Sequence, residues 1–183
     1  MTNLTTLAAA GLILAAGMAQ AEGKYGTTAI QAPAPAAEAP AAQAAPAAGS
    51  LVHAADPQGV LAAMQALGHT ATLGSDGAGD PMISGGFEGS QYQVFFYGCE
   101  ANANCQWLVF STGYDLPNGG TPDMVNSWNA THLVGQAYLD GEQDPMLNYF
   151  VTTTGGLTQE NFADVVDWWR VAVEEFSTAV GGA

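Results

Sequence analysis

Two aromatic-rich runs flank a short segment bounded by Cys99 and Cys105. In the first run, residues 92–97, large apolar side chains recur at every second position, and the second run, residues 107–110, is aromatic and β-branched. Such runs are typical of strands, and a short connection between two of them predicts an antiparallel hairpin. We therefore expect these two runs to form the central antiparallel pair of a sheet.

The first 21 residues predict a secretory signal peptide. An apolar core over residues 7–18 is followed by Ala19, Gln20 and Ala21, the small-x-small pattern that signal peptidase reads. A retained membrane anchor is the alternative, but the apolar stretch is shorter than the roughly 20 residues that a spanning helix needs. We expect cleavage after Ala21 and a periplasmic protein with no membrane span.

Cys99 and Cys105 are predicted to form a structural disulfide across the ends of a five-residue loop. An oxidising compartment favours this bond, and closing so small a ring contributes about 2 kcal/mol by the chain-entropy estimate. The alternatives are a redox-active pair or free thiols. A redox pair usually has Cys-x-x-Cys spacing in an electropositive environment, whereas this spacing is wider and the flanking charge is Glu100.

The chain is strongly acidic, with 17 Asp and Glu residues against two Lys and Arg residues and a formal net charge of −15. Nucleic acids and anionic lipid surfaces are bound through clusters of Lys and Arg, which this sequence lacks. Both kinds of partner are therefore strongly disfavoured. The charge has two interpretations: solubility of an exported protein, or binding of cations or basic partners.

Residues 22–50 are expected to form a disordered spacer. The Ala/Pro-rich part, residues 32–49, contains no aromatic or branched apolar side chain, so it cannot bury enough surface to offset its chain entropy. Proline-rich sequence of this kind favours an extended, semi-stiff conformation. Residues 51–181 follow as one domain, which is long enough to bury a single core.

Three helices are predicted in this domain from their capping residues. They begin after Asp56, Thr121 and Thr158, and the first two have proline at their first position. Each has an apolar face. The expected buried positions are Val60, Leu61, Met64 and Leu67 in the first helix, Met124, Val125 and Trp128 in the second, and Phe162, Val165, Val166, Trp169, Val173, Phe176 and Val180 in the third.

Four further strands complete the expected fold, at about residues 70–73, 81–87, 135–139 and 146–153. The resulting order is helix, four strands, helix, two strands, helix. This order predicts an α+β fold in which three helices pack on an antiparallel sheet.

Asp140, Glu142 and Asp144 present carboxylates at alternate positions, as a calcium-binding loop does. The pattern then departs from an EF-hand, which needs Gly and Glu where this chain has Pro145 and Val151. We predict a polar hairpin turn and no metal site. The two cysteines and three histidines also lack zinc-type spacing.

No catalytic residue and no cofactor are predicted. The sequence contains no Gly-x-Ser-x-Gly elbow, no His-Glu-x-x-His motif and no Gly-Lys-Ser/Thr of a phosphate loop. Two carboxylates can come together only in the folded protein, where no sequence motif marks them, so a catalytic pair of this kind is an alternative that stays open. A hydrolase or a redox enzyme would need such a pair, or reducible cysteines, and we expect a non-enzymatic protein.

Trp168 is the candidate residue for binding a partner. Trp128 and Trp169 fall on apolar stripes that should form the core. Trp168 lies about 100 degrees around its helix from Trp169, at the rim of the stripe or on an exposed patch. An exposed patch would favour a protein partner.

Several short motifs resemble, in their order and spacing, the YbjN-domain family, which is proposed to act in bacterial sensory transduction as a regulator. The motifs are Tyr97-Gly98-Cys99, Cys105, Phe110, Asn126-x-Trp128-Asn129, Ala137-Tyr138-Leu139-Asp140, Asp144-Pro145 and the helix over residues 162–169. The resemblance covers about residues 56–176. It implies a fold similar to the type III secretion chaperones, small α+β domains that bind other proteins, and it supplies no catalytic residues.

The leader, the spacer and the cysteine pair depart from cytosolic members of that family and resemble exported forms, which argues against a cytoplasmic signalling role. The leading hypothesis is therefore a non-enzymatic periplasmic protein-binding or regulatory module whose partner is a protein; its oligomeric state is open, with a homodimer as one form. The alternative is an acidic envelope structural or cation-responsive protein.

Overall fold

The computed structural model describes residues 49–181, which form nine elements in the predicted order. The expected signal peptide, residues 1–21, and nearly all of the expected spacer, residues 22–50, lie outside the described residues. The helices are α1 (Pro57–Ala66), α2 (Pro122–Thr131) and α3 (Gln159–Ala179), and the strands are β1 (Thr70–Ser75), β2 (Pro81–Phe87), β3 (Ser90–Tyr97), β4 (Trp107–Gly113), β5 (Gln136–Leu139) and β6 (Pro145–Thr152).

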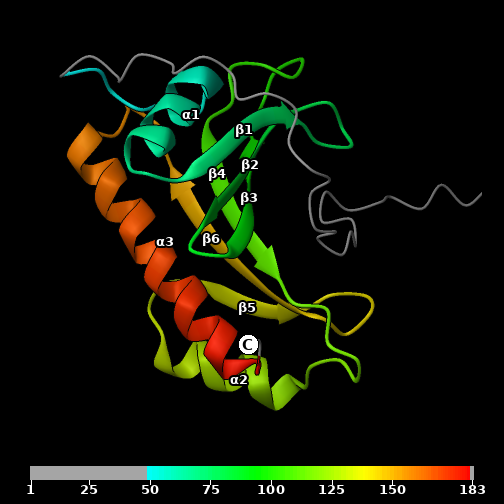
Figure 1. Ribbon diagram of the computed structural model, residues 1–183. Helices are drawn as coiled ribbons and strands as arrows, with labels where there is room; N and C mark the ends of the chain where they lie inside the picture. The colour runs from blue at the N-terminus through cyan, green and yellow to red at the C-terminus, as the bar shows by residue number, and fades with distance from the viewer. Residues whose placement is uncertain (1–48, 182–183) are drawn as a thin grey trace, which may run out of the picture.

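The six strands form one antiparallel sheet in the order β1-β2-β3-β4-β6-β5 (Figure 1). β3 and β4 are its central pair, as the aromatic runs predict. β6 lies between β4 and β5, although β5 precedes β6 in the chain. The fold is therefore the expected α+β arrangement of three helices and an antiparallel sheet.

α3 packs along one face of the sheet, which we call the inner face (Figure 1). Its Trp169 ring lies 5.8 Å from the ring of Phe110 and 5.9 Å from that of Tyr92, measured between centroids. α1 packs beside β1 and α2 beside β5, at the two edges of the sheet. The core is thus a single layer between the helices and the inner face of the strands.

The predicted caps start all three helices. The side chains of Asp56, Thr121 and Thr158 each accept a hydrogen bond from a backbone N–H three residues later. Leu67, which was expected on the buried face of α1, is instead 42% exposed. α1 ends at Ala66 and the chain turns at Gly68, so Leu67 no longer follows the apolar stripe of the helix.

The chain enters the domain at a fixed point beside α3. Val52 and Leu157 form an isolated antiparallel bridge with backbone hydrogen bonds of 2.8 and 3.0 Å. The Ala54 N–H donates to the hydroxyl of Thr153, which follows β6. These contacts hold the start of the domain at the end of β6 that is farther from the β5–β6 turn.

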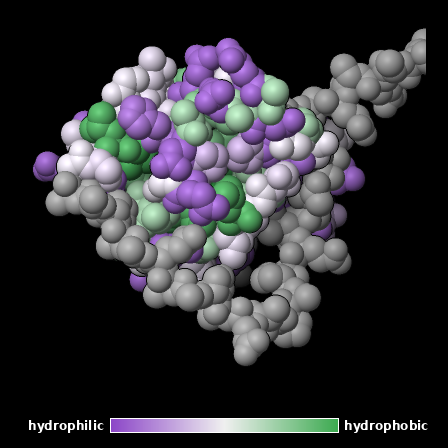
Figure 2. All heavy atoms as spheres, turned by 90° about the horizontal axis from the view of Figure 1, so that it is seen from above, coloured by the Kyte–Doolittle hydropathy of each residue, from purple (hydrophilic) through white to green (hydrophobic). Residues whose placement is uncertain are grey.

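The end of the molecule that carries α1 has a mixed surface. Seen from above, hydrophilic side chains are interspersed with small hydrophobic groups, and the described atoms show no large continuous apolar area there (Figure 2). None of the helices within residues 49–181 is long and apolar enough to cross a membrane.

Candidate functional site

Cys99 and Cys105 form a disulfide, and neither is left as a free thiol. Asn102, inside the loop that the bond closes, donates through its side-chain amide to the Ala78 carbonyl at 3.1 Å and to an Asp80 carboxylate oxygen at 3.0 Å. The disulfide closes the β3–β4 loop, and the Asn102 side chain holds this loop against the β1–β2 turn. The predicted disulfide is therefore confirmed, and its purely structural role stays a prediction.

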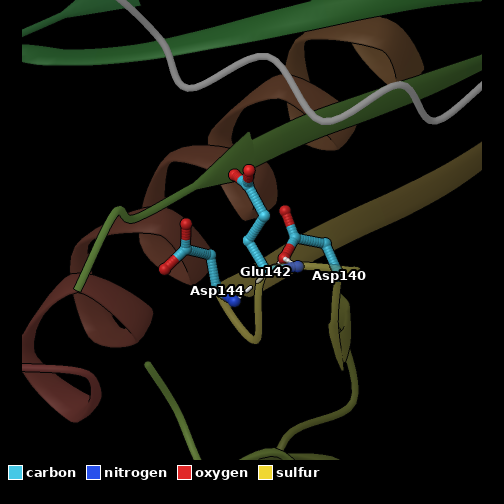
Figure 3. A group of neighbouring side chains, drawn as sticks. All are labelled: Asp140, Glu142 and Asp144. Carbon is cyan, nitrogen blue, oxygen red and sulfur yellow. Dashed lines mark hydrogen bonds between the residues drawn. The ribbon is translucent and has the colours of Figure 1, made fainter. Parts of the chain in front are cut away.

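The carboxylates of Asp140, Glu142 and Asp144 gather at the β5–β6 turn, with ligand oxygens within 4.8 Å of one another (Figure 3). Asp140 Oδ1 accepts the backbone N–H groups of Glu142 and Asp144, both at 2.9 Å. Asp144 Oδ1 accepts the N–H of Leu116 at 3.0 Å. One oxygen of each aspartate is thus already used in folding the chain.

This geometry is that of a polar turn in which carboxylates bind backbone N–H groups. Hard cations such as Ca²⁺ take oxygen ligands from carboxylates, so the remaining oxygens could contact an ion. A bound cation would reduce the electrostatic repulsion between the three carboxylates. The predicted lack of a metal site stays a prediction.

Two of the three described histidines, His69 and His132, lie in separate structural contacts. His69 is 9% exposed, and its Nδ1 lies 2.7 Å from the hydroxyl of Tyr92. His132 stacks on the Trp128 ring at a centroid distance of 3.6 Å, and its Nε2 lies 3.5 Å from a Glu175 oxygen. The Nδ1 atom of His132 also lies 3.0 Å from the hydroxyl of Thr131, which donates to the Ser127 carbonyl at 2.8 Å, so this hydroxyl is already used in the last turn of α2.

The face of the sheet opposite α3, which we call the outer face, carries an apolar row that the sequence analysis missed. Strand register aligns Met82, Phe95, Val109 and Phe150 across four adjacent strands, and we call these residues the outer row. Trp107 lies beside it, with its ring 6.2 Å from that of Phe150. Val109 is buried but does not belong to the core cluster on the inner face.

The outer face is also uncharged. None of the six strands contains Asp, Glu, Lys, Arg or His, whereas the turns at both ends of the strands carry carboxylates. Apolar residues at the outer positions of residues 92–97 and 107–110 were visible as a signal in the sequence. They could not be assigned to one row, because the alignment depends on strand register.

Two residues of α2 hold the edge strand β5. The Asn129 amide donates to the Ala137 carbonyl at 3.0 Å and accepts the Ala137 N–H at 2.8 Å. The Trp128 indole N–H donates to the Gly135 carbonyl at 2.8 Å. Trp128 and Asn129 of the Asn126-x-Trp128-Asn129 motif therefore anchor this strand.

Trp168 is 51% exposed, in agreement with a position outside the apolar stripe of α3. It shares one flank of the helix with Asp164 and Glu175, at helical spacings of four and seven residues. Glu175 contacts His132 near β5. Trp168 is thus on the flank that faces the β5–β6 side of the sheet, and a role in binding a partner stays a prediction.

The family comparison agrees with these motifs. A model of the YbjN family, described as "Putative bacterial sensory transduction regulator", matches residues 56–182, more than half of the chain. The chain belongs to the YbjN family.

A solved structure supports the YbjN fold. The chain resembles the crystal structure of YbjN from E. coli, titled a putative transcription regulator, with a TM-score of 0.50 and 19% sequence identity. The similarity covers 71% of this chain and 91% of the E. coli chain. A search of curated proteins gives no match.

Proposed function

We propose that this YbjN-family chain is a non-enzymatic protein-binding or regulatory module that works in the periplasm. The observation that carries the proposal is the outer row on an uncharged sheet face, with the helices packed on the other face. An apolar surface bordered by polar groups is typical of a site where another protein docks. The expected similarity to type III secretion chaperones, which bind proteins, is part of this proposal.

The chemistry of the described residues favours binding over catalysis. Cys99 and Cys105 are oxidised, His69 is buried against Tyr92, and the carboxylates of the β5–β6 turn bind backbone groups. Nucleic acid is a poor partner, because the chain carries a net charge of −15. The regulatory action we propose therefore proceeds through protein contact.

The periplasmic location rests on the leader over residues 1–21 and is supported by the disulfide. N-terminal sequencing of the protein from a periplasmic fraction tests it. We expect a chain that begins at Glu22 and contains oxidised cysteines. A cytoplasmic, reduced chain that still begins at Met1 would overturn the location.

Site-specific photocrosslinking tests the binding function. A photoreactive phenylalanine analogue replaces Phe95 in the outer row, and in a matched control it replaces Ala66, an exposed residue of α1. We expect a discrete protein adduct in cells from position 95 and none from position 66. No adduct from position 95, or the same adducts from both positions, contradicts the proposal; an adduct of twice the chain mass identifies a homodimer.

A cation-responsive envelope protein is the second candidate, and the carboxylate cluster at the β5–β6 turn favours it. Calorimetric titration of the purified chain with calcium tests this candidate. Heat that disappears in an Asp144→Asn variant supports it, and a titration without heat removes it.

A further inference from the structure

The outer edge of β6 has backbone groups without a strand partner. The Pro145 carbonyl accepts the Tyr114 N–H and the Thr153 N–H donates to the Gln106 carbonyl, so the odd-numbered residues of β6 direct their backbone groups toward β4. Because direction alternates along a strand, Phe150 and Thr152 direct theirs to the opposite edge. β5 pairs with β6 only from Pro145 to Asn148. Among the described strands, none pairs with Phe150 or Thr152 on that side.

The edge of β6 at Phe150 and Thr152 is open, whereas the side chain of Asn129 blocks the edge of β5. Asn129 occupies both backbone groups of Ala137 on β5. Phe150 is 59% exposed and Thr152 is also exposed. An edge strand of this kind is a template for pairing with another extended chain.

A pocket of about 690 Å³ lies where β5 stops and β6 continues. Its lining includes Leu133, which is fully exposed, together with Asn148 and Phe150. Asn148 Oδ1 is buried and has no hydrogen-bond partner in the described part of the chain. The pocket therefore lies next to the unused backbone groups and is lined by a residue whose buried acceptor has no partner.

The two sides of the open edge differ in chemistry. On the outer side the apolar row ends at Phe150. On the inner side, α3 presents Trp168 on the same flank as two carboxylates, and one of these, Asp164, lies close enough to raise the pKa of Tyr149, second to the effect of burial. The only Arg or Lys within residues 49–181, Arg170, already pairs with Asp167 and Glu174.

We propose that the edge of β6 at Phe150 and Thr152 binds an extended segment of a partner protein as an added strand, and that this segment alternates apolar with basic side chains. The apolar side chains extend the outer row beyond Phe150. The basic side chains face the acidic flank of α3, where a cation can lie over the Trp168 ring. This inference rests on the proposed function and specifies the chemistry of the partner.

A second copy of the chain is a poorer occupant. Each copy has a net charge of −15, with carboxylates in the turns at both ends of the sheet, so two copies repel each other. A basic segment gains from the same carboxylates. Sedimentation velocity of the full chain and of a Thr152→Pro variant decides between a second copy and a basic segment as the occupant of this edge. A dimer that dissociates in the Thr152→Pro variant would overturn the proposal of a basic partner.

Fluorescence anisotropy with a labelled peptide, Lys-Val-Lys-Phe-Lys-Val-Lys, tests the inference on the purified full chain. Thr152→Pro removes the edge-facing N–H and leaves the ladder with β4 intact. Thr152→Val is the matched control, because it also loses the hydroxyl but keeps the N–H. We expect Thr152→Val to bind the peptide as the parent chain does, and Thr152→Pro to bind at least about tenfold more weakly, which is about 1.4 kcal/mol.

Three further peptides keep the test independent of how Thr152→Pro folds. We expect at least about tenfold weaker binding when alternate amides are N-methylated, when Glu replaces Lys, or when the same residues are arranged in blocks. Equal binding by the N-methylated peptide, or no binding of the alternating peptide, overturns the inference. If position 95 still gives its photocrosslink after such a result, the proposed binding function stands and only the edge and its basic segment are rejected.

Discussion

The hydroxyl of Tyr92 lies 2.7 Å from Nδ1 of His69 in the interior of the domain. The ring of Phe87 meets the imidazole at 5.3 Å in an edge-on contact. Burial lowers the pKa of His69 from its ordinary value of 6.5, and the charge of Arg170 lowers it further. The imidazole is therefore neutral in the native protein near neutral pH.

Acidification is expected to destabilise the domain through this histidine. The pKa of His69 is lower in the native state than in the unfolded state, so below about pH 6.5 the unfolded chain binds more protons and the free energy of unfolding falls. Thermal unfolding followed by circular dichroism between about pH 7 and 5 measures this fall. His69→Gln should show a shallower dependence, and an unchanged slope would assign the effect to other groups.

Removal of the disulfide should cost about 2 kcal/mol in free energy of unfolding, because a small ring in the unfolded chain is opened. Urea denaturation of the oxidised chain and of a Cys99→Ala/Cys105→Ala variant measures the difference. Reduction of the parent chain should give a similar loss. A variant with parent stability would show that the contacts of Asn102 hold the loop without the bond.

Asn129→Ala should loosen β5, because it removes both hydrogen bonds to Ala137. We expect a loss of about 1–2 kcal/mol and faster hydrogen exchange at the Ala137 amide. Asn126→Ala is the control, since it makes the same change on an exposed part of α2. Equal exchange at Ala137 in the two variants would count against the anchoring role.

Two buried tryptophans should respond differently to replacement by phenylalanine. Trp128 donates its indole N–H to Gly135, whereas the indole nitrogen of the fully buried Trp169 has no partner within the described chain. Trp128→Phe leaves a carbonyl without its donor, so it should cost about 1 kcal/mol more than Trp169→Phe. Chemical denaturation compares the two, and a larger loss for Trp169→Phe would contradict this explanation.

The β5–β6 turn should need an acceptor at position 140 more than it needs a charge. Asp140→Asn keeps an oxygen for the N–H groups of Glu142 and Asp144, and it should change stability by only a few tenths of a kcal/mol. Asp140→Ala should cost about 1–2 kcal/mol. Thermal unfolding at low salt compares them, with Glu142→Gln as a charge control. Equal losses in both Asp140 variants would show that the charge itself is required.

Local signals in the sequence predicted every helix and strand of the domain. Proline and capping residues mark the helix starts, and alternation marks β3, so these elements depend on nearby residues. The placement of β6 between β4 and β5 depends on contacts far apart in the chain, and no local pattern encodes it. The outer row and the open edge follow from that placement. The exposure of Trp168 could therefore be predicted from helical spacing, whereas the position of Phe150 at an open edge could not.

The bridge between Val52 and Leu157 determines how the domain is oriented when it is attached through its N-terminal extension. The bridge lies near the end of β6, and the Asp140–Asp144 turn lies at the other end, about 25 Å away at the usual rise of a strand. Immobilisation upstream of Val52 therefore brings the disulfide loop toward the support and directs the acidic turn into solution. A binding assay on such a support leaves that turn freely accessible to soluble ions.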